Sequence, residues 1–143
     1  MERDKERIRI VIDSNIIFSF IIKGKNSAYL DIFSNDNLEA YAPEAIIHEF
    51  RKHRERLKGK SEAFAEGVFL AFSIIRIMPR EFYLDSFEKA YNICRRFDEK
   101  DSPFIGLALT LNIPIWTNDK GILENKGEYQ IITINELRAL LDE

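Results

Sequence analysis

Residues 7–22, RIRIVIDSNIIFSFII, begin the fold and contain its first functional candidate. β-Branched residues fill Ile8 to Ile12, which predicts a buried strand, and this pattern stops abruptly at Asp13. The apolar residues that follow are typical of a helix over 15–22. A buried strand followed at once by a helix is the first half of a β–α unit, and such units build parallel sheets.

The same alternation continues to the end of the chain. We expect further strands at 38–42 (LEAYA), 74–78 (IIRIM), 113–117 (IPIWT) and 129–134 (YQIITI). We expect helices at 28–35 after a Ser27 cap, 43–57 with Pro43 in its first turn, 62–74 after a Ser61 cap, 86–97, 102–111 and 135–143. The segment 74–78 could instead extend the preceding helix. The pattern predicts an α/β domain with a mainly parallel sheet and helices on both faces.

Length and composition are those of one globular domain, 1–143, because 143 residues with 45% hydrophobic content can bury a core without staples. The net charge of −3 gives no global attraction for nucleic acid, so a phosphate-bearing partner would need a local patch or metal ions. Cys94 is the single cysteine, which excludes disulfide frameworks and cysteine zinc sites, and its apolar setting predicts a core thiol.

Two further features bear on localisation. The apolar runs are interrupted or too short to cross a bilayer, and the N-terminus opens with charged residues instead of an export signal. We therefore expect a soluble, cytoplasmic protein.

Two acids fall where parallel sheets bind their ligands, outside the carboxyl ends of the strands. Asp13 follows the first strand directly, and Asp119 closely follows the strand at 113–117. Each has an ordinary structural explanation as well. Asp13 could form a turn or cap the next helix, and Asp119 could form a turn with Asn118 and Gly121.

Two more acids lie at or near helix starts. Glu49 is three residues from Ile46 on the helix at 43–57, so its carboxylate lies beside the apolar stripe, where His48 or Arg51 could pair with it. Asp101 stands where it could cap the apolar helix at 102–111. Asp98 and Glu99, just before it, could simply interact with the helix dipole.

Considered together, the four acids suggest a metal site. If they converge, each pair about 5 Å apart repels by on the order of 3 kcal/mol at an effective dielectric of about 20. A cation must then neutralise them. Oxygen ligands without cysteine or a paired histidine motif favour hard ions, Mg²⁺ or Mn²⁺, over zinc.

The segments VIDSN, PEAIIHEF, DEKDSPFIGLAL and IPIWTNDKG, in this order and spacing, resemble the PIN-domain nucleases. The resemblance covers essentially the whole chain, and the third motif together with WTND is its most specific part. It implies a three-layer α/β/α sandwich around a mainly parallel, about five-stranded sheet. It also implies Mg²⁺- or Mn²⁺-dependent hydrolysis of RNA phosphodiester bonds by an endoribonuclease.

The resemblance also assigns roles to particular residues. The four acidic metal-site and catalytic positions of the family correspond to Asp13, Glu49, Asp101 and Asp119. Supporting positions correspond to Asn15, Thr117 and Asp98. Some relatives carry another acid close behind the last one; here Lys120 and Gly121 follow, and Glu124 is the nearest substitute, which leaves one or two metal ions open.

Other families that begin with a strand-tip acid fit less well. A haloacid-dehalogenase phosphatase needs a second acid where Asn15 stands, and Lys120 is in the wrong context for a receiver domain. The chain is most similar to small stand-alone PIN proteins of the VapC-like toxin type. That likeness implies an antitoxin protein as partner and a homodimer, with 61–74 either an apolar contact surface or simply core. The alternative is a catalytically weak PIN-like module that binds RNA or a protein.

Residues 51–60, RKHRERLKGK, are the one strongly basic run. It could be a solvated helix end, since cations suit the C-terminal end of the helix dipole. Alternatively it guides an RNA backbone toward the acids through salt-sensitive phosphate contacts. The RNA-binding candidates are Arg51, Lys52, Arg54, Arg56 and Lys58, whereas His48 and His53 are expected to be surface groups.

Overall fold

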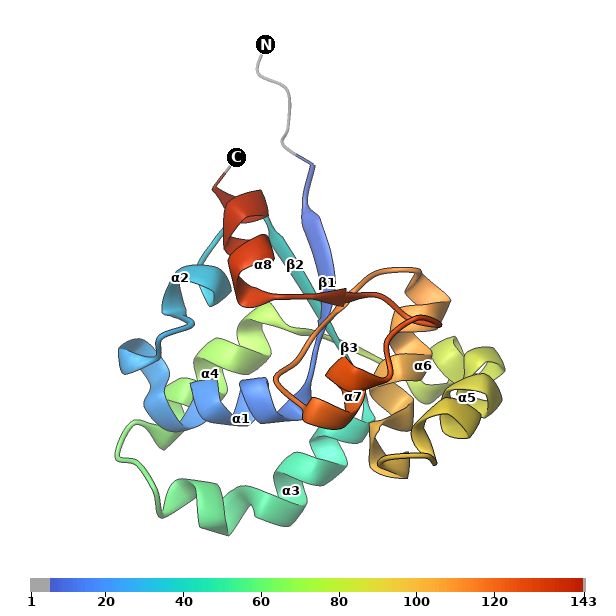
Figure 1. Ribbon diagram of the computed structural model, residues 1–143. Helices are drawn as coiled ribbons and strands as arrows, with labels where there is room; N and C mark the ends of the chain where they lie inside the picture. Colours follow the sequence, from blue (N-terminus) through green and yellow to red (C-terminus); the bar gives the residue numbers. More distant parts are fainter. Residues whose placement is uncertain (1–5, 143) are drawn as a thin grey trace.

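The computed structural model describes residues 6–142 and contains one five-stranded sheet in which every strand pair is parallel (Figure 1). The strands are β1 (Ile8–Ile12), β2 (Leu38–Pro43), β3 (Arg76–Met78), β4 (Ile115–Trp116) and β5 (Ile131–Ile132). Their order across the sheet is β3-β2-β1-β4-β5. β1 is therefore the central strand: β2 and β3 follow one another on one side of it, and β4 and β5 on the other.

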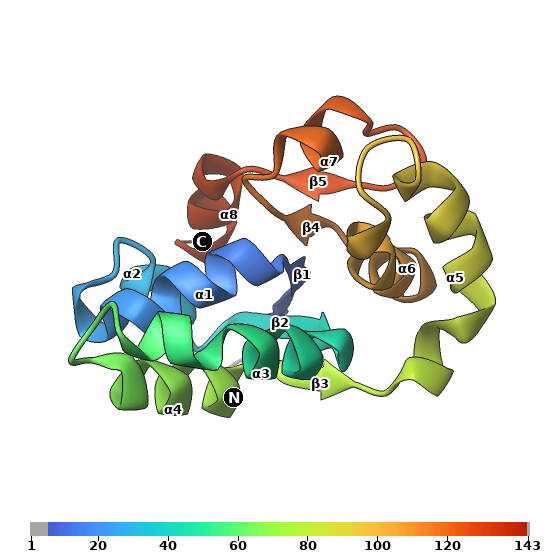
Figure 2. The same ribbon diagram turned by 90° about the horizontal axis from the view of Figure 1, so that it is seen from below.

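The helices cover both faces of this sheet, as the alternating pattern predicts. They are α1 (Ser14–Lys23), α2 (Leu30–Phe33), α3 (Ala45–Lys58), α4 (Phe64–Ile74), α5 (Arg80–Cys94), α6 (Ser102–Leu111), α7 (Lys120–Glu124) and α8 (Ile134–Leu141), with 3-10 turns η1 (Gly24–Asn26) and η2 (Glu99–Asp101). Figure 2 shows α5 and α6 on one side of the strands and α1, α2 and α8 on the other. The expected three-layer α/β/α sandwich is confirmed.

The core lies on both sides of the central strands. Helix α6 is apolar on nearly every side and packs against β1, β2 and β4, with α5 outside it. On the opposite face Phe20 and Phe33 stack with ring centroids 4.0 Å apart, and Phe33 also packs against Trp116. Each such buried side chain contributes roughly 1.5–3 kcal/mol to the free energy of folding. This packing fixes the helices against the central strands of the sheet.

Several element boundaries differ from the sequence-based expectation. Pro43 does not lie in the helix: it ends β2, and the Glu44 N–H bonds to Met78 O at 2.9 Å, so α3 begins only at Ala45. Ser27 and Ser61 accept bonds from N–H groups two residues on, but the side chain of neither caps a helix. As a result α2 and α4 are shorter than predicted.

Three further outcomes concern whole elements, one predicted strand and two helices that differ from the prediction. Residues 76–78 form strand β3, so the helical alternative for this segment is wrong. Helix α5 spans Arg80–Cys94, whereas the sequence predicts a helix at 86–97. It begins directly after Pro79, where the Arg80 N–H bonds to Glu44 Oε1 at 2.9 Å. The short helix α7 was not predicted.

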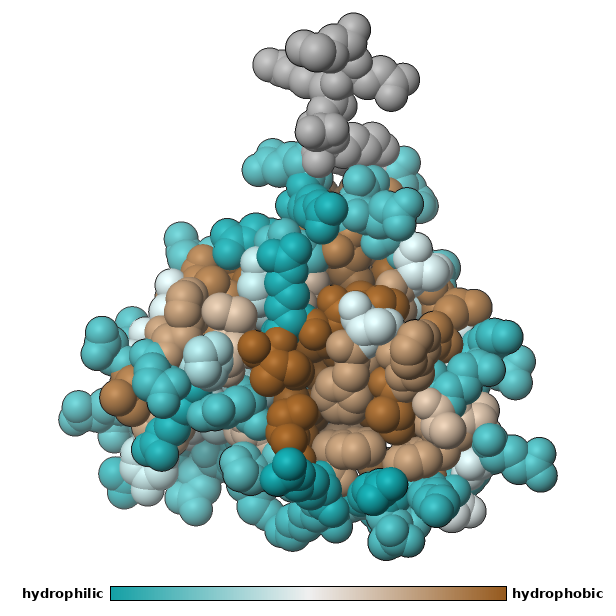
Figure 3. All heavy atoms as spheres, turned by 180° about the vertical axis from the view of Figure 1, so that it is seen from behind, coloured by the Kyte–Doolittle hydropathy of each residue, from teal (hydrophilic) through white to brown (hydrophobic). Residues whose placement is uncertain are grey.

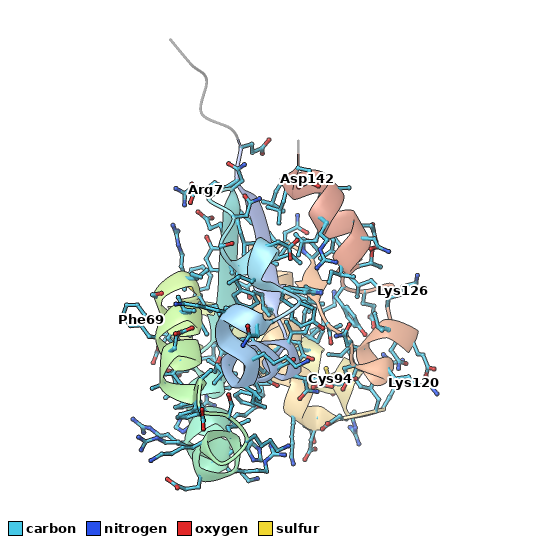
Figure 4. The ribbon with its side chains drawn as sticks, turned by 90° about the vertical axis from the view of Figure 1, so that its left-hand side faces the viewer. Arg7, Phe69, Cys94, Lys120, Lys126 and Asp142 are labelled. Atoms are coloured by element: carbon cyan, nitrogen blue, oxygen red, sulfur yellow. The ribbon has the colours of Figure 1, made fainter. Side chains whose placement is uncertain are left out.

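The segment 61–74 is partly core and partly surface. Phe64, Gly67 and Ala71 are buried, whereas Phe69 is 71% exposed and points away from α4 (Figure 4). From behind, an apolar area runs down the middle of the molecule between charged margins (Figure 3). None of the helices within 6–142 combines the length and the apolar character that crossing a membrane requires.

Candidate metal centre

The candidate site lies at the end of β1, the point where the strand order of the sheet reverses. β1 pairs with β2 on one side and β4 on the other, and ligands of such sheets bind outside the carboxyl ends at this point. Figure 2 looks at this edge, with α1, α3, α6 and α7 around the ends of β1 and β4. All four acids belong to these segments.

Asp13 is fixed by the pairing of β1 with β4. Ile12 is in register with Trp116, so the next residues along, Asp13 and Thr117, stand side by side. The Thr117 hydroxyl donates to Asp13 Oδ2 at 2.8 Å, and the Ser14 N–H donates to Asp13 Oδ1 at 2.9 Å. Asp13 is only 2% exposed, and it therefore occupies one defined orientation.

Asp119 is tied to the same threonine. Its backbone N–H donates to Thr117 Oγ1 at 2.9 Å, while its Oδ1 accepts from the Ile122 N–H at 3.1 Å and caps α7. A Cβ at Gly121 would lie 2.8 Å from Phe97 Cδ2 and 3.1 Å from Asp119 Oδ1. A side chain at position 121 would therefore have to displace the side chain of Phe97 or Asp119.

Asp101 does not form the capping bond predicted for it. It occupies the position before α6 but makes no side-chain cap bond, and its Oδ2 is buried without a hydrogen-bond partner. The capping is done by Asp98, whose Oδ1 accepts from the Lys100 N–H at 3.0 Å at the start of η2. Asp101 therefore keeps a free carboxylate oxygen inside the protein.

The acids are close enough for their charges to shift one another's pKa. Burial raises the pKa of Asp101 to about 8, and four acidic charges add to the effect, in the order Asp119, Asp13, Asp98 and Glu49. Burial likewise raises the pKa of Asp13 to about 6, which the Thr117 hydrogen bond opposes and the Asp119 charge favours. A carboxylate that is desolvated and surrounded by like charges holds its proton or needs a cation.

Glu49 belongs to this cluster from the side of α3. Burial raises its pKa; the Ser14 hydroxyl opposes the shift, and the charges of Asp13 and Asp98 favour it. Within the part of the chain that the structure describes, no ion pair joins Glu49 to His48 or Arg51, the partners considered from sequence. The charges that act on Glu49 are therefore those of the other acids and of Lys100.

The neighbouring polar residues separate into those near the cluster and those away from it. Ser14, which sequence reasoning missed, is 9% exposed and touches Asp13; its place directly after that acid was the available signal. Asn15 is exposed. Glu99 lies near the Tyr91 hydroxyl, which donates to it at 3.5 Å, and Glu124 pairs with Lys120 at 3.7 Å on the surface.

The donor set fits a hard divalent cation in its chemistry. All the groups are carboxylate or hydroxyl oxygens, which hard cations prefer. Asp101 Oδ2 is buried without a hydrogen-bond partner, and several negative charges act on its carboxylate. Within residues 6–142 no three acidic, histidine or cysteine side chains are close enough together to hold one ion as they stand. Carboxylates of like charge repel one another, and this repulsion keeps them apart.

The basic run does not form one surface. Arg51 and Arg54 line a groove of about 520 Å³ beside α4, whereas Lys52 and His53 line one of about 590 Å³ that also contains Glu49. Figure 4 views α3 almost end-on, with nitrogen-tipped side chains spreading to both sides. Arg56 and Lys58 are exposed in the last turn of α3. Cys94 is a buried free thiol, as predicted.

Comparisons with solved structures agree with the fold. The chain resembles VapBC2 from Rickettsia felis, solved bound to a DNA fragment from its promoter, with a TM-score of 0.65 and 13% identity over 88% of this chain and 98% of that one. It also resembles PAE2754 from Pyrobaculum aerophilum, with a TM-score of 0.61 and 12% identity over 95% and 91% of the two chains.

Comparison by sequence assigns the chain to a family. A search among curated proteins found no match. The family model described as PIN domain, however, matches residues 11–130, a span that runs from β1 to the residue before β5 and includes all four acids. The chain therefore belongs to the PIN-domain family.

Proposed function

We propose that this PIN-domain protein is a metal-dependent endoribonuclease that hydrolyses RNA phosphodiester bonds with Mg²⁺ or Mn²⁺. The observation that carries the proposal is the environment of Asp101. Its buried, unpartnered Oδ2 faces the charges of Asp13, Glu49, Asp98 and Asp119 at the carboxyl edge of the sheet. Structural capping does not account for such an arrangement, whereas binding a cation and a phosphate does.

The proposed roles follow from how each side chain is held. Asp13 and Asp101 would hold the ion, since one is rigid and the other has a free oxygen lone pair. A bound Mg²⁺ or Mn²⁺ screens phosphate charge, lowers the pKa of water and stabilises the leaving oxygen. Glu49 borders the groove beside α3, from which it would accept the proton of an attacking water, and Asp119 would complete the acidic set.

Three groups keep these acids in place. Thr117 orients Asp13 and the backbone of Asp119, and Ser14 holds the other oxygen of Asp13. Asp98 adds negative charge from the start of η2. Fixing a ligand through its outer hydrogen bonds typically changes metal affinity or activity by about 10–100-fold.

The test is cleavage of single-stranded RNA with and without Mn²⁺. Separate Asp13→Asn and Asp101→Asn variants are expected to lose at least about 10²-fold in rate, because each removes a charged ligand while keeping the shape of the side chain. Glu124→Gln, an acid on the exposed surface of α7, is the matched control and should cleave like wild type. Full activity in either site variant contradicts the assignment.

The same experiment distinguishes the nuclease from the alternative, a PIN-like module that binds RNA or protein without cleaving it. The wide spacing of the acids favours that alternative, since no three of them within 6–142 are in coordinating range. RNA binding with no cleavage at any Mn²⁺ concentration would support the module and end the nuclease proposal.

We further propose that the chain is the toxin of a toxin–antitoxin pair, acting in the cytoplasm and forming a homodimer. The likeness of its fold to VapBC2 supports this role. Phe69, Phe82 and Leu84 are 71%, 44% and 50% exposed and offer apolar area for a protein contact. Co-expression with the protein encoded immediately beside it should yield a stable complex that suppresses RNA cleavage. Light scattering of the isolated chain should give twice the monomer mass.

A further inference from the structure

A groove of about 590 Å³ starts at Glu49 and runs between α3 and α5; we refer to it as the α3–α5 groove. Its α3 wall includes Glu49, Lys52 and His53, its α5 wall includes Tyr91, and Lys100 of η2 closes one side. Because Glu49 is both a wall of the groove and a member of the acidic cluster, the groove opens onto the candidate metal centre.

The groove carries cations as well as acids. Glu49, Lys52, His53 and Arg56 are spaced by three or four residues, so they share one face of α3. Burial and then the nearby charges of Arg56, Lys52 and Lys100 lower the pKa of His53, which places these cations around it. Among residues 6–142, neither Lys52 nor Lys100 has an acidic partner within ion-pair distance. Both lysines therefore lie in the groove without a close carboxylate partner, although Glu49 and Glu99 line the same groove.

The opposite wall offers an aromatic surface. Tyr91 is 38% exposed, and its hydroxyl is directed to Glu99. Phe87, one turn earlier on α5, lies in the same wall and packs against the core. A partly exposed tyrosine ring can stack on a nucleobase, since every base has a face that can stack, and Arg95, whose Cζ lies 6.0 Å from the Tyr91 ring centroid, adds a cation beside that ring.

The other side of α3 lacks this combination. Arg51 and Arg54 line a groove whose remaining lining is apolar, formed with α4, and no acid of the cluster borders it. The two sides of α3 thus carry similar numbers of cations in different surroundings. Only the side of Lys52 joins cations, an aromatic ring and the acidic centre.

We propose that the α3–α5 groove binds the RNA strand next to the scissile phosphate, with Lys52 and Lys100 contacting a backbone phosphate and Tyr91 stacking on an unpaired base. The proposal rests on the nuclease function above, and it names the side chains of this chain that hold the strand. A base inside a duplex is already stacked on both faces, so it cannot reach Tyr91.

The test measures binding of a labelled single-stranded RNA by fluorescence anisotropy, in the Asp101→Asn background so that the probe stays intact. Lys52→Gln/Lys100→Gln should weaken binding by at least about 10-fold and reduce the salt dependence by about 1.4 log units per log unit of salt, as expected for two lost phosphate contacts. Tyr91→Leu should weaken binding by about 5-fold or more with an unchanged salt slope. Unlabelled duplex RNA of the same sequence should compete poorly.

Arg51→Gln/Arg54→Gln is the matched control, since it removes two charges from the same helix on the other side. It should change binding by less than about 2-fold beyond the general effect of net charge. Equal weakening by the two double variants would overturn the proposal, as would wild-type-like binding by Tyr91→Leu together with Lys52→Gln/Lys100→Gln.

The two proposals fail in different ways. If unmutated protein cleaves RNA with Mn²⁺ while the groove variants bind and cleave as it does, the groove assignment is wrong and the nuclease stands. If unmutated protein never cleaves but loses RNA binding through the groove variants, the groove assignment stands and the nuclease is wrong.

Discussion

Thr117 connects two acids of the site through a single hydroxyl. The oxygen donates to Asp13 Oδ2 at 2.8 Å and accepts from the Asp119 N–H at 2.9 Å, and the side chain is 4% exposed. Thr117→Val keeps the shape but leaves two buried polar groups unpaired, and each such group costs about 1–3 kcal/mol. We expect a loss of at least about 1–3 kcal/mol in unfolding free energy, measured by denaturant titration, and weaker Mn²⁺ binding by calorimetry.

Thr117→Ser serves as the control because it retains the hydroxyl and removes only a methyl group. It should keep metal affinity within about 3-fold of wild type, with a small loss of stability from the missing methyl. If Thr117→Val binds Mn²⁺ as tightly as Thr117→Ser does, the threonine contributes packing alone and has no role in positioning the acids.

Asp101 shows what a residue type can and cannot indicate. An acid before a helix with Pro103 in its first turn is typical of a cap, so Asp101 was expected to cap α6, and Asp98 and Glu99 were expected only to interact with the helix dipole. The structure gives the capping bond to Asp98 and leaves Asp101 Oδ2 without one. The choice depends on backbone angles, extended at Asp98 and helical at Asp101, and local sequence does not encode these strongly enough.

Among the elements, the contact between α1 and α4 depends on one glycine. A Cβ on Gly67 would lie 2.0 Å from the backbone oxygen of Ile21, which no side-chain rotation can relieve. Gly67→Ala must therefore separate the two helices. We expect a loss of about 2–3 kcal/mol or more, and a fall of roughly 6–12 °C in the melting temperature, measured by circular dichroism.

Gly59→Ala tests whether that effect is specific to the crossing. Gly59 follows α3 with a negative φ of −69°, and the nearest atom to an added Cβ is 3.6 Å away. Alanine there should be neutral or stabilise the protein by up to about 1 kcal/mol, since it restricts the unfolded chain. Equal destabilisation by both substitutions would mean that the α1–α4 contact is not the cause.

The elements that were predicted well are those whose own sequence determines them. Strand β1 and helix α6 have the expected bounds, because a β-branched run and a fully apolar helix leave few alternatives. The start of α5 coincides with a tertiary bond from the Arg80 N–H to Glu44, and α7 begins with a local capping bond from the Ile122 N–H to Asp119. Such long-range or capping partners are not visible in local periodicity, which explains these errors.

For the whole molecule, strand order is what assembles the site. The sequence indicates that Asp13 and Asp119 lie at strand ends, but their contact requires β4 to pair with β1, and Asp101 joins them because α6 packs across β1, β2 and β4. A parallel sheet in another order would hold the same four acids apart. Residue patterns therefore suggested that the acids share one edge of the sheet, the family resemblance assigned them to one site, and the groove between α3 and α5 was not foreseen.

The buried acids make the stability of the whole protein depend on pH in an unusual direction. The pKa values of Asp101, about 8, and Asp13, about 6, are raised above those of the unfolded chain, so the folded state binds more protons between about pH 4 and pH 8. Stability then falls as pH rises through this window, and the full cost is present above pH 8. His53, whose pKa is lowered, acts in the opposite direction, but its exposure to solvent keeps that effect small.

We therefore expect metal-free protein to be less stable at pH 8 than at pH 5, by on the order of 3 kcal/mol in urea unfolding. Saturating Mn²⁺ at pH 8 should restore much of the difference, because an ion that binds only the folded state stabilises it by mass action. Asp101→Asn should flatten the profile and raise metal-free stability at pH 8, while removing the response to Mn²⁺. A metal-free stability that rises from pH 5 to pH 8 would show that the four acids do not form one buried, repulsive cluster, and it would remove the physical basis for placing a cation among them.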